Sequence, residues 1–109
     1  MPSVSIHYGP DQELDSDDFI ALSERLLASV VDHLGAQPDK VQIMLLALAY
    51  APIGQPVYIE IKARSNEIRT VSVLQGFVEQ VDHVTFKAFG CRCRIRYFSY
   101  PGDFLAAAN

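Results

Sequence analysis

The sequence predicts an α+β domain of two layers, in which duplicated β-α-β units form a four-stranded mixed sheet with two helices on one face. Three observations lead to this prediction. An amphipathic helical stripe separates two strand patterns in the first half, the same order returns in the second half, and a run rich in proline and glycine (51–56) lies between them. We expect one domain over residues 1–109, with pseudo-repeats at 2–52 and 57–104.

The first half begins with a strand over residues 3–8, in which apolar and polar side chains alternate until a Gly-Pro pair ends it. The next element is a helix that begins at Asp15 or Ser16, because these residues can cap it and acidic residues follow in the first turn. Gly35 fits the position just past the end of this helix. The residues of its apolar stripe are Phe19, Leu22, Leu26, Leu27, Val30, Val31 and Leu34.

The second strand, expected over 41–50, is apolar on both faces, which favours parallel pairing and burial on both sides. The second half then repeats the order of the first. Residues 57–63 alternate as a strand, residues 64–67 carry cap residues for a second helix, and a helical stripe runs from 71 to 81. Residues 82–90 fit either a helical tail or a loop, and residues 91–98 alternate strictly as a last strand.

The two faces of the predicted sheet differ in character. Each β-α-β unit should be right-handed with parallel strands, so both helices cover the same face. That face is apolar and collects Val4, Ile6, Ile43, Ile59, Ile61, Cys93 and Ile95. The opposite face mixes charged and apolar side chains, which indicates an oligomer with a partly wet interior, or alternatively an open face in water.

Composition argues against several classes of protein. The net charge of −4 does not suggest general binding to nucleic acid or to an anionic membrane. The first twenty residues are acidic, which is unlike a secretory leader, and the apolar run from 43 to 50 is too short to span a bilayer. Cys91 and Cys93 lie about 7 Å apart along a strand, too far for an unstrained disulfide. We expect two reduced thiols in a cytoplasmic protein, without a metal site.

The start of the chain offers a candidate for proton transfer. Met1-Pro2 is a good substrate for removal of the initiator methionine, which would leave a secondary amine at the head of a packed strand. A terminal amine titrates near pH ~8, and burial lowers the pKa of a cationic acid, so this nitrogen could act as a general base. The alternative is a structural proline, tolerated at the first residue of a strand because no ladder donor is needed there.

Four segments, taken with the order of elements, resemble a known superfamily. They are Met1-Pro2, Tyr58-Ile59-Glu60-Ile61, Arg64-Ser65-Asn66-Glu67 and the ending 96–104, Arg-Tyr-Phe-Ser-Tyr-Pro-Gly-Asp-Phe. On these residues the chain resembles the tautomerase superfamily, which includes 4-oxalocrotonate tautomerase, 5-carboxymethyl-2-hydroxymuconate isomerase and macrophage migration inhibitory factor. A small bacterial family of unassigned function within it is similar over nearly the whole chain.

The resemblance implies a cofactor-independent tautomerase or isomerase, assembled as a homotrimer, that moves a proton on a small 2-hydroxy-dienoate or 2-keto acid. Pro2 matches the proline that moves the proton. Arg64 matches an arginine that holds the substrate carboxylate, with Arg69 as its rival. Three further residues are implied at the substrate: Tyr97, Tyr100 and Lys40, the last displaced toward the second strand.

Two other hypotheses fit the same order of elements. A ferredoxin-like module without catalytic activity has this order too, and there the second and third strands are neighbours. In the duplicated-unit interpretation the first and third strands form the central antiparallel pair. A tautomerase fold that has lost its chemistry is the other possibility.

Overall fold

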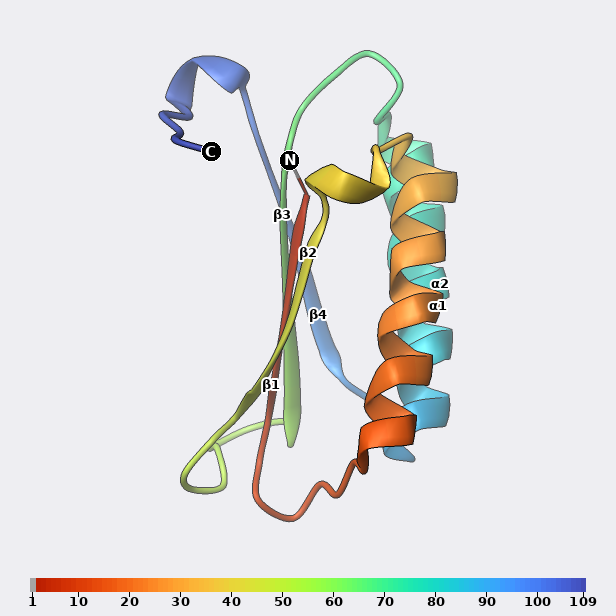
Figure 1. The fold of residues 1–109 in the computed structure, drawn as a ribbon, viewed down its shortest axis with the longest axis vertical. Helices are drawn as coiled ribbons and strands as arrows, with labels where there is room; N and C mark the ends of the chain where they lie inside the picture. The colour runs from red at the N-terminus through yellow and green to blue at the C-terminus, as the bar shows by residue number, and fades with distance from the viewer. Residues whose placement is uncertain (1) are drawn as a thin grey trace.

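Each half of the sequence contributes two strands and one helix to the two predicted layers, in a computed structural model that describes residues 2–109. One layer is a sheet of β1 (Ser3–Tyr8), β2 (Gln42–Ala47), β3 (Val57–Arg64) and β4 (Arg94–Tyr100). The other consists of α1 (Ser16–Leu34) and α2 (Val71–Phe89), which lie side by side on one face of the sheet (Figure 1). Two short 3₁₀ helices, η1 (Pro38–Lys40) and η2 (Gly102–Phe104), complete the fold.

The strand order, β2-β1-β3-β4, decides between the two topologies considered above. β1 pairs with β2 in parallel and with β3 antiparallel, and β3 pairs with β4 in parallel. The central pair is therefore β1 with β3. This confirms the duplicated β-α-β units, and the ferredoxin-like hypothesis is wrong because β2 and β3 are not neighbours.

Both helices begin and end at residues suited to those positions. The side chain of Asp15 accepts a hydrogen bond from the Asp18 amide at 2.8 Å, and Gly35, at φ 65°, ends α1 as predicted. Thr70 caps α2, so the expectation that this helix opens within 64–67 is wrong. Asn66 instead accepts hydrogen bonds from the two amides of residues 68 and 69, which forms a turn before the helix. Residues 82–89 continue α2.

The core lies between the sheet and the helices. Apart from the half-buried Tyr8, the helix-side residues of the two central strands are fully buried, and the core is completed by one stripe from each helix. Its most buried members are Val4, Ile6, Leu26, Val30, Leu34, Val57, Ile59, Ile61, Phe77 and Val81. No helix among residues 2–109 combines the length and apolar character needed to cross a membrane.

The sheet face turned away from the helices has no cover in the single chain. Met44, Leu46 and Phe98 are 37%, 39% and 48% exposed there. The expectation that the second strand is buried on both sides is wrong for this chain alone, because β2 is an edge strand and stands only against β1. The predicted mixture of charged and apolar side chains on this open face is confirmed.

Candidate functional site

Four segments of the chain meet at one end of the sheet because of its topology. β1 and β3 are antiparallel, so the start of β1 lies beside the end of β3. β2 and β4 run parallel to these two strands, which brings the segment before β2 and the segment after β4 to the same end. The C-terminus labelled in Figure 1 lies there, near the start of β1. Residues far apart in sequence thus become neighbours.

A cleft of about 670 Å³ opens at this end. Its cationic side chains come from η1 and β3, and its apolar side chains come from the C-terminal segment. The residues that line it are Ser3, Lys40, Lys62, Arg64, Tyr100, Phe104, Leu105, Ala107 and Asn109. Three of the predicted site residues, Lys40, Arg64 and Tyr100, therefore share one cavity.

Pro2 lies beside this cleft and is fully buried. Its carbonyl accepts a hydrogen bond from the Gln42 amide at 3.1 Å, which fixes it against the start of β2. The next residue, Ser3, lines the cleft and stands opposite Lys62 in the pairing of β1 with β3. Met1, on whose removal the predicted chemistry depends, lies outside the described residues.

Arg64 is positioned by the turn that follows β4. It stands opposite Tyr100 in the parallel pairing of β3 with β4, and the Ser65 amide donates to the Tyr100 carbonyl at 2.7 Å. The Arg64 side chain lies directly over Gly102, where a Cβ atom would come within 3.1 Å of the Arg64 Cδ. The absence of a side chain at residue 102 thus lets the arginine lie against the turn as it reaches the cleft.

Two of the cleft cations have no carboxylate partner within the described chain. The ion pairs among residues 2–109 join Lys62 to Glu60 at 3.5 Å and Arg92 to Asp82 at 3.6 Å. Lys40 and Arg64 take part in neither. Since unpaired cations beside an apolar wall suit a ligand with a carboxylate and an apolar part, the cleft is a candidate site for a small organic anion.

Two predicted substrate-binding residues lie elsewhere. The Arg69 side chain donates to the backbone carbonyls of Leu34 at 3.1 Å and Arg64 at 2.6 Å, so it ties the end of α1 to the end of β3. Tyr97 points to the helix side of the sheet, where its ring packs edge-on against Phe77. Burial raises the pKa of the Tyr97 phenol. Neither Arg69 nor Tyr97 lines the cleft.

The sequence interpretation missed part of the cleft wall. Lys62 follows the same two-residue alternation as Arg64, so its place on the same strand face could have been inferred. Phe104 and Leu105 gave only a weaker signal, an apolar pair just after a Pro-Gly turn. Their part in the cleft depends on how the segment after β4 folds back over the end of the sheet.

Comparison with solved structures places this architecture among known ones. A member of the cis-3-chloroacrylic acid dehalogenase family, N1, superposes with a TM-score of 0.81 at 16% identity, over 96% of this chain and 79% of that one. A fused 4-OT described as a symmetric trimer gives 0.80 at 16% identity, over 98% and 92% of the two chains. Pt0534, solved after inactivation by 2-oxo-3-pentynoate, gives 0.76 at 22% identity, over 97% and 91%.

This chain has the tautomerase fold. The match extends over nearly all of it, so both β-α-β units and the strand order belong to the shared architecture. No protein-family model and no curated protein matches the sequence. The likeness to these solved structures is therefore one of fold, at 16–22% sequence identity.

Proposed function

We propose that this protein is a tautomerase-superfamily enzyme that moves a proton on a small 2-hydroxy-dienoate or 2-keto acid. The main support is the position of Pro2. It lies at the head of β1, beside the cleft that Arg64, Lys40 and Tyr100 line. In this proposal the initiator methionine is removed and the Pro2 nitrogen is a free secondary amine.

Pro2 serves as the base and then as the acid. Its surroundings favour the neutral amine, because burial and the nearby cations Lys40, Lys62 and Arg64 all disfavour a positive charge at that nitrogen. A base whose pKa falls near the working pH transfers protons most efficiently. Removal of Met1 is needed for this role, since an acylated nitrogen has no basic lone pair.

Arg64 and Lys40 hold the substrate carboxylate, and the Tyr100 ring lines the space beside it. The neutral amine takes the proton from the 2-hydroxyl group of the enol. The electron pair of the O–H bond forms the carbonyl at C2, the π electron pair of the C2=C3 double bond moves to C3, and C3 uses this pair to take the proton from the prolinium. The reaction is an isomerisation in which one proton moves from oxygen to carbon, so its atoms and electrons balance without a co-reactant.

Ketonisation of phenylenolpyruvate and 2-hydroxymuconate tests this role directly. Pro2→Ala should lower kcat/KM by about 100-fold or more, which is within the range of general acid–base catalysis. Arg64→Gln should cost about tenfold to a hundredfold, the value of a charge-assisted hydrogen bond. Pro56 precedes β3 as Pro2 precedes β1, so Pro56→Ala is a matched control that should leave turnover unchanged.

Intact mass of the purified protein shows whether Met1 has been removed. If methionine is retained, or if Pro2→Ala and the parent react at equal rates, the proline has no role in the chemistry. A parent protein that turns over neither acid would favour a tautomerase fold without activity.

Chemical labelling provides a second test. Since Pt0534 is described as inactivated by 2-oxo-3-pentynoate, we expect the same electrophilic keto acid to add to the Pro2 amine of this chain. Peptide mapping should place one adduct on the N-terminal peptide. Arg64→Gln should slow the labelling, because the carboxylate of the reagent then has one cation fewer to bind it. Labelling confined to Cys91 or Cys93 would contradict the proposal.

We also propose that the chain forms a homotrimer in which the open sheet faces are turned inward. Support comes from the uncovered apolar residues Met44, Leu46 and Phe98 on that face, and from the trimers named for the fused 4-OT structures. Light scattering after size exclusion should give three times the chain mass. Phe98→Asp should shift the mass toward the monomer, whereas Phe86→Asp, 50% exposed on the outer helix layer, should not.

A further inference from the structure

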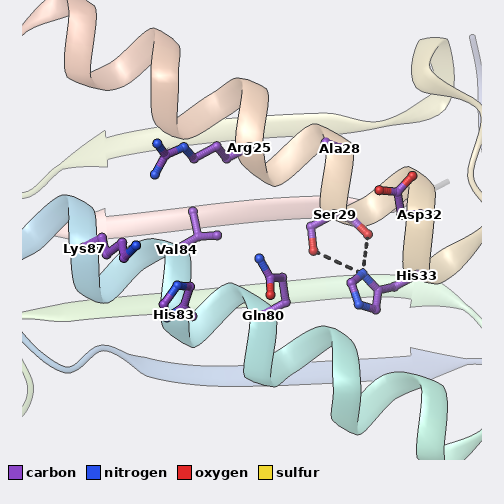
Figure 2. A pocket seen from close by; sticks show the side chains of 9 residues that line it. All are labelled: Arg25, Ala28, Ser29, Asp32, His33, Gln80, His83, Val84 and Lys87. Atoms are coloured by element: carbon purple, nitrogen blue, oxygen red, sulfur yellow. Dashed lines mark hydrogen bonds between the residues drawn. The ribbon is translucent and has the colours of Figure 1, made fainter.

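A second hollow lies on the opposite side of the molecule, in the groove between α1 and α2. It has a volume of about 410 Å³ and is lined by Arg25, Ala28, Ser29, Asp32, His33, Gln80, His83, Val84 and Lys87, which we call the interhelix groove. Its floor is made of small or apolar side chains, and long polar side chains rise on both sides (Figure 2). None of these residues takes part in the cleft beside Pro2.

The charges of the helix layer are unevenly distributed. α1 and α2 together carry one arginine, one lysine and two histidines, and all four line the interhelix groove. The carboxylates of the two helices are Asp17, Asp18, Glu24, Asp32, Glu79 and Asp82, of which only Asp32 lines it. An adjoining hollow shares Arg25 and Lys87 and also includes Asp18. The two cations of the helix layer, Arg25 and Lys87, therefore lie at one place, with Asp18 and Asp32 on either side of it along α1.

Arg25 and Lys87 form the cationic end of the groove. Figure 2 shows them on opposite helices, with the Lys87 side chain directed along the groove toward His83. Neither takes part in the ion pairs found among residues 2–109. Because two unpaired cations that face each other repel, an anion between them is favourable, and a tetrahedral oxyanion can accept hydrogen bonds from both.

The other end of the groove is polar but less cationic. The His33 Nδ1 lies 3.0 Å from the Ser29 carbonyl, and since a carbonyl only accepts, Nδ1 carries the proton and donates to it. With the proton on Nδ1, Nε2 is the ring nitrogen that can accept a hydrogen bond. Gln80 points into the groove beside it, whereas the Asp32 carboxylate points away from α2 (Figure 2). Arg25 and His33 are eight residues apart on α1, which corresponds to about 12 Å.

We propose that the interhelix groove binds a phosphorylated small polar molecule. Its phosphate lies between Arg25 and Lys87, near His83, and its organic part extends along Ala28 and Val84 toward Gln80 and His33. An inorganic phosphate is too small to reach both ends. Hydroxyl groups on the organic part suit the far end, because they can donate to the His33 Nε2 and bond with the Gln80 amide.

Titration of the full chain at constant ionic strength with ribose 5-phosphate, inorganic phosphate and ribose tests the proposal. Calorimetry should show ribose 5-phosphate binding at least tenfold more tightly than either fragment. Amide NMR shifts should centre on residues 25–33 and 80–87. Arg25→Gln with Lys87→Gln should weaken binding of both phosphates at least tenfold, and Gln80→Ala should weaken only ribose 5-phosphate. All three side chains are exposed, so these variants should fold normally.

Arg92→Gln is the control for net charge, because it removes one of the two positive charges lost in the double variant, but from the ion pair with Asp82, whose residues do not line the groove. If Arg92→Gln lost as much affinity as the double variant, net charge alone would explain the effect, and the proposal would be overturned. Absence of binding at about 10 mM ribose 5-phosphate, or NMR shifts confined to the cleft beside Pro2, would do the same.

Discussion

Replacing Tyr97 by phenylalanine tests whether this residue belongs to the core or to the site. Its hydroxyl oxygen is buried and has no hydrogen-bond partner within residues 2–109, while its ring stands edge-on to Phe77 with centroids 6.1 Å apart. A buried hydroxyl without a partner costs about 1–3 kcal/mol. Tyr97→Phe removes this cost and keeps the aromatic pair, so we expect the free energy of unfolding to rise by about 1 kcal/mol, the lower end of that range.

Urea unfolding followed by circular dichroism measures this change at a fixed protein concentration, since assembly would add to stability. The melting temperature should rise by about 4 °C for a domain of this size. Tyr50→Phe, at a site 85% exposed, is the matched control and should change neither quantity. A loss of 1 kcal/mol or more in Tyr97→Phe would mean that the phenol has a stabilising partner. If Tyr97→Phe lowered the rate of ketonisation and left stability unchanged, Tyr97 would act at the substrate site and not only in the core.

Three further predictions follow from local geometry. Gly35→Ala should destabilise the protein by about 1–2 kcal/mol in urea unfolding, because φ is 65° there and a Cβ would lie 2.7 Å from the Ile68 Cδ1. Burial raises the pKa of Cys93 to about 11, so in a Cys91→Ser variant the remaining thiol should react with iodoacetamide at pH 8 about 100-fold more slowly than in urea. The same shift predicts stability that is constant below pH ~9 and falls as the pH rises toward 11, because only the unfolded thiol then loses its proton. Arg69→Gln should lower the free energy of unfolding by about 1–3 kcal/mol, because the Leu34 and Arg64 carbonyls then lose their donor. Unchanged stability together with a raised KM would instead support a direct contact between Arg69 and the substrate.

Periodicity was sufficient to predict the elements and their order, because each strand and helix buries one face and the buried residues repeat at the matching spacing. It did not fix the start of α2. Asn66 has the chemistry of a cap, yet it closes a turn, and Thr70 caps the helix four residues later. Local propensity could not tell a turn residue from a helix cap here, because both residue types bind nearby backbone amides. The choice depends on the path of the loop before α2, which Arg69 ties to the end of α1 through the Leu34 carbonyl.

The predicted residues that meet in the cleft, Arg64, Tyr100 and Lys40, came from the family resemblance, because the sequence pattern ended the two strands at residues 63 and 98. The structure extends β3 to Arg64 and β4 to Tyr100, and the parallel register then pairs these two residues. Arg69 lies in a loop, and its guanidinium is bound to two carbonyls that no sequence pattern brings together. Tyr97 and Tyr100 are three residues apart on one strand and therefore point to opposite faces, which places only Tyr100 in the cleft.

The duplicated architecture contains its own comparison for the proposed chemistry. A pseudo-twofold relation between the halves exchanges β1 with β3, so the start of β3 at the other end of the sheet corresponds to the start of β1. A proline precedes both strands, and its carbonyl accepts an amide in both cases, from Gln42 at Pro2 and from Gly9 at Pro56. The two donors come from non-equivalent elements, β2 for Pro2 and the residue after β1 for Pro56, and Pro2 is fully buried whereas Pro56 is half-buried. For the proposed chemistry, the further difference is that removal of Met1 would leave a free amine at Pro2, and that its end of the sheet holds Arg64 and Lys40 without carboxylate partners in the described chain.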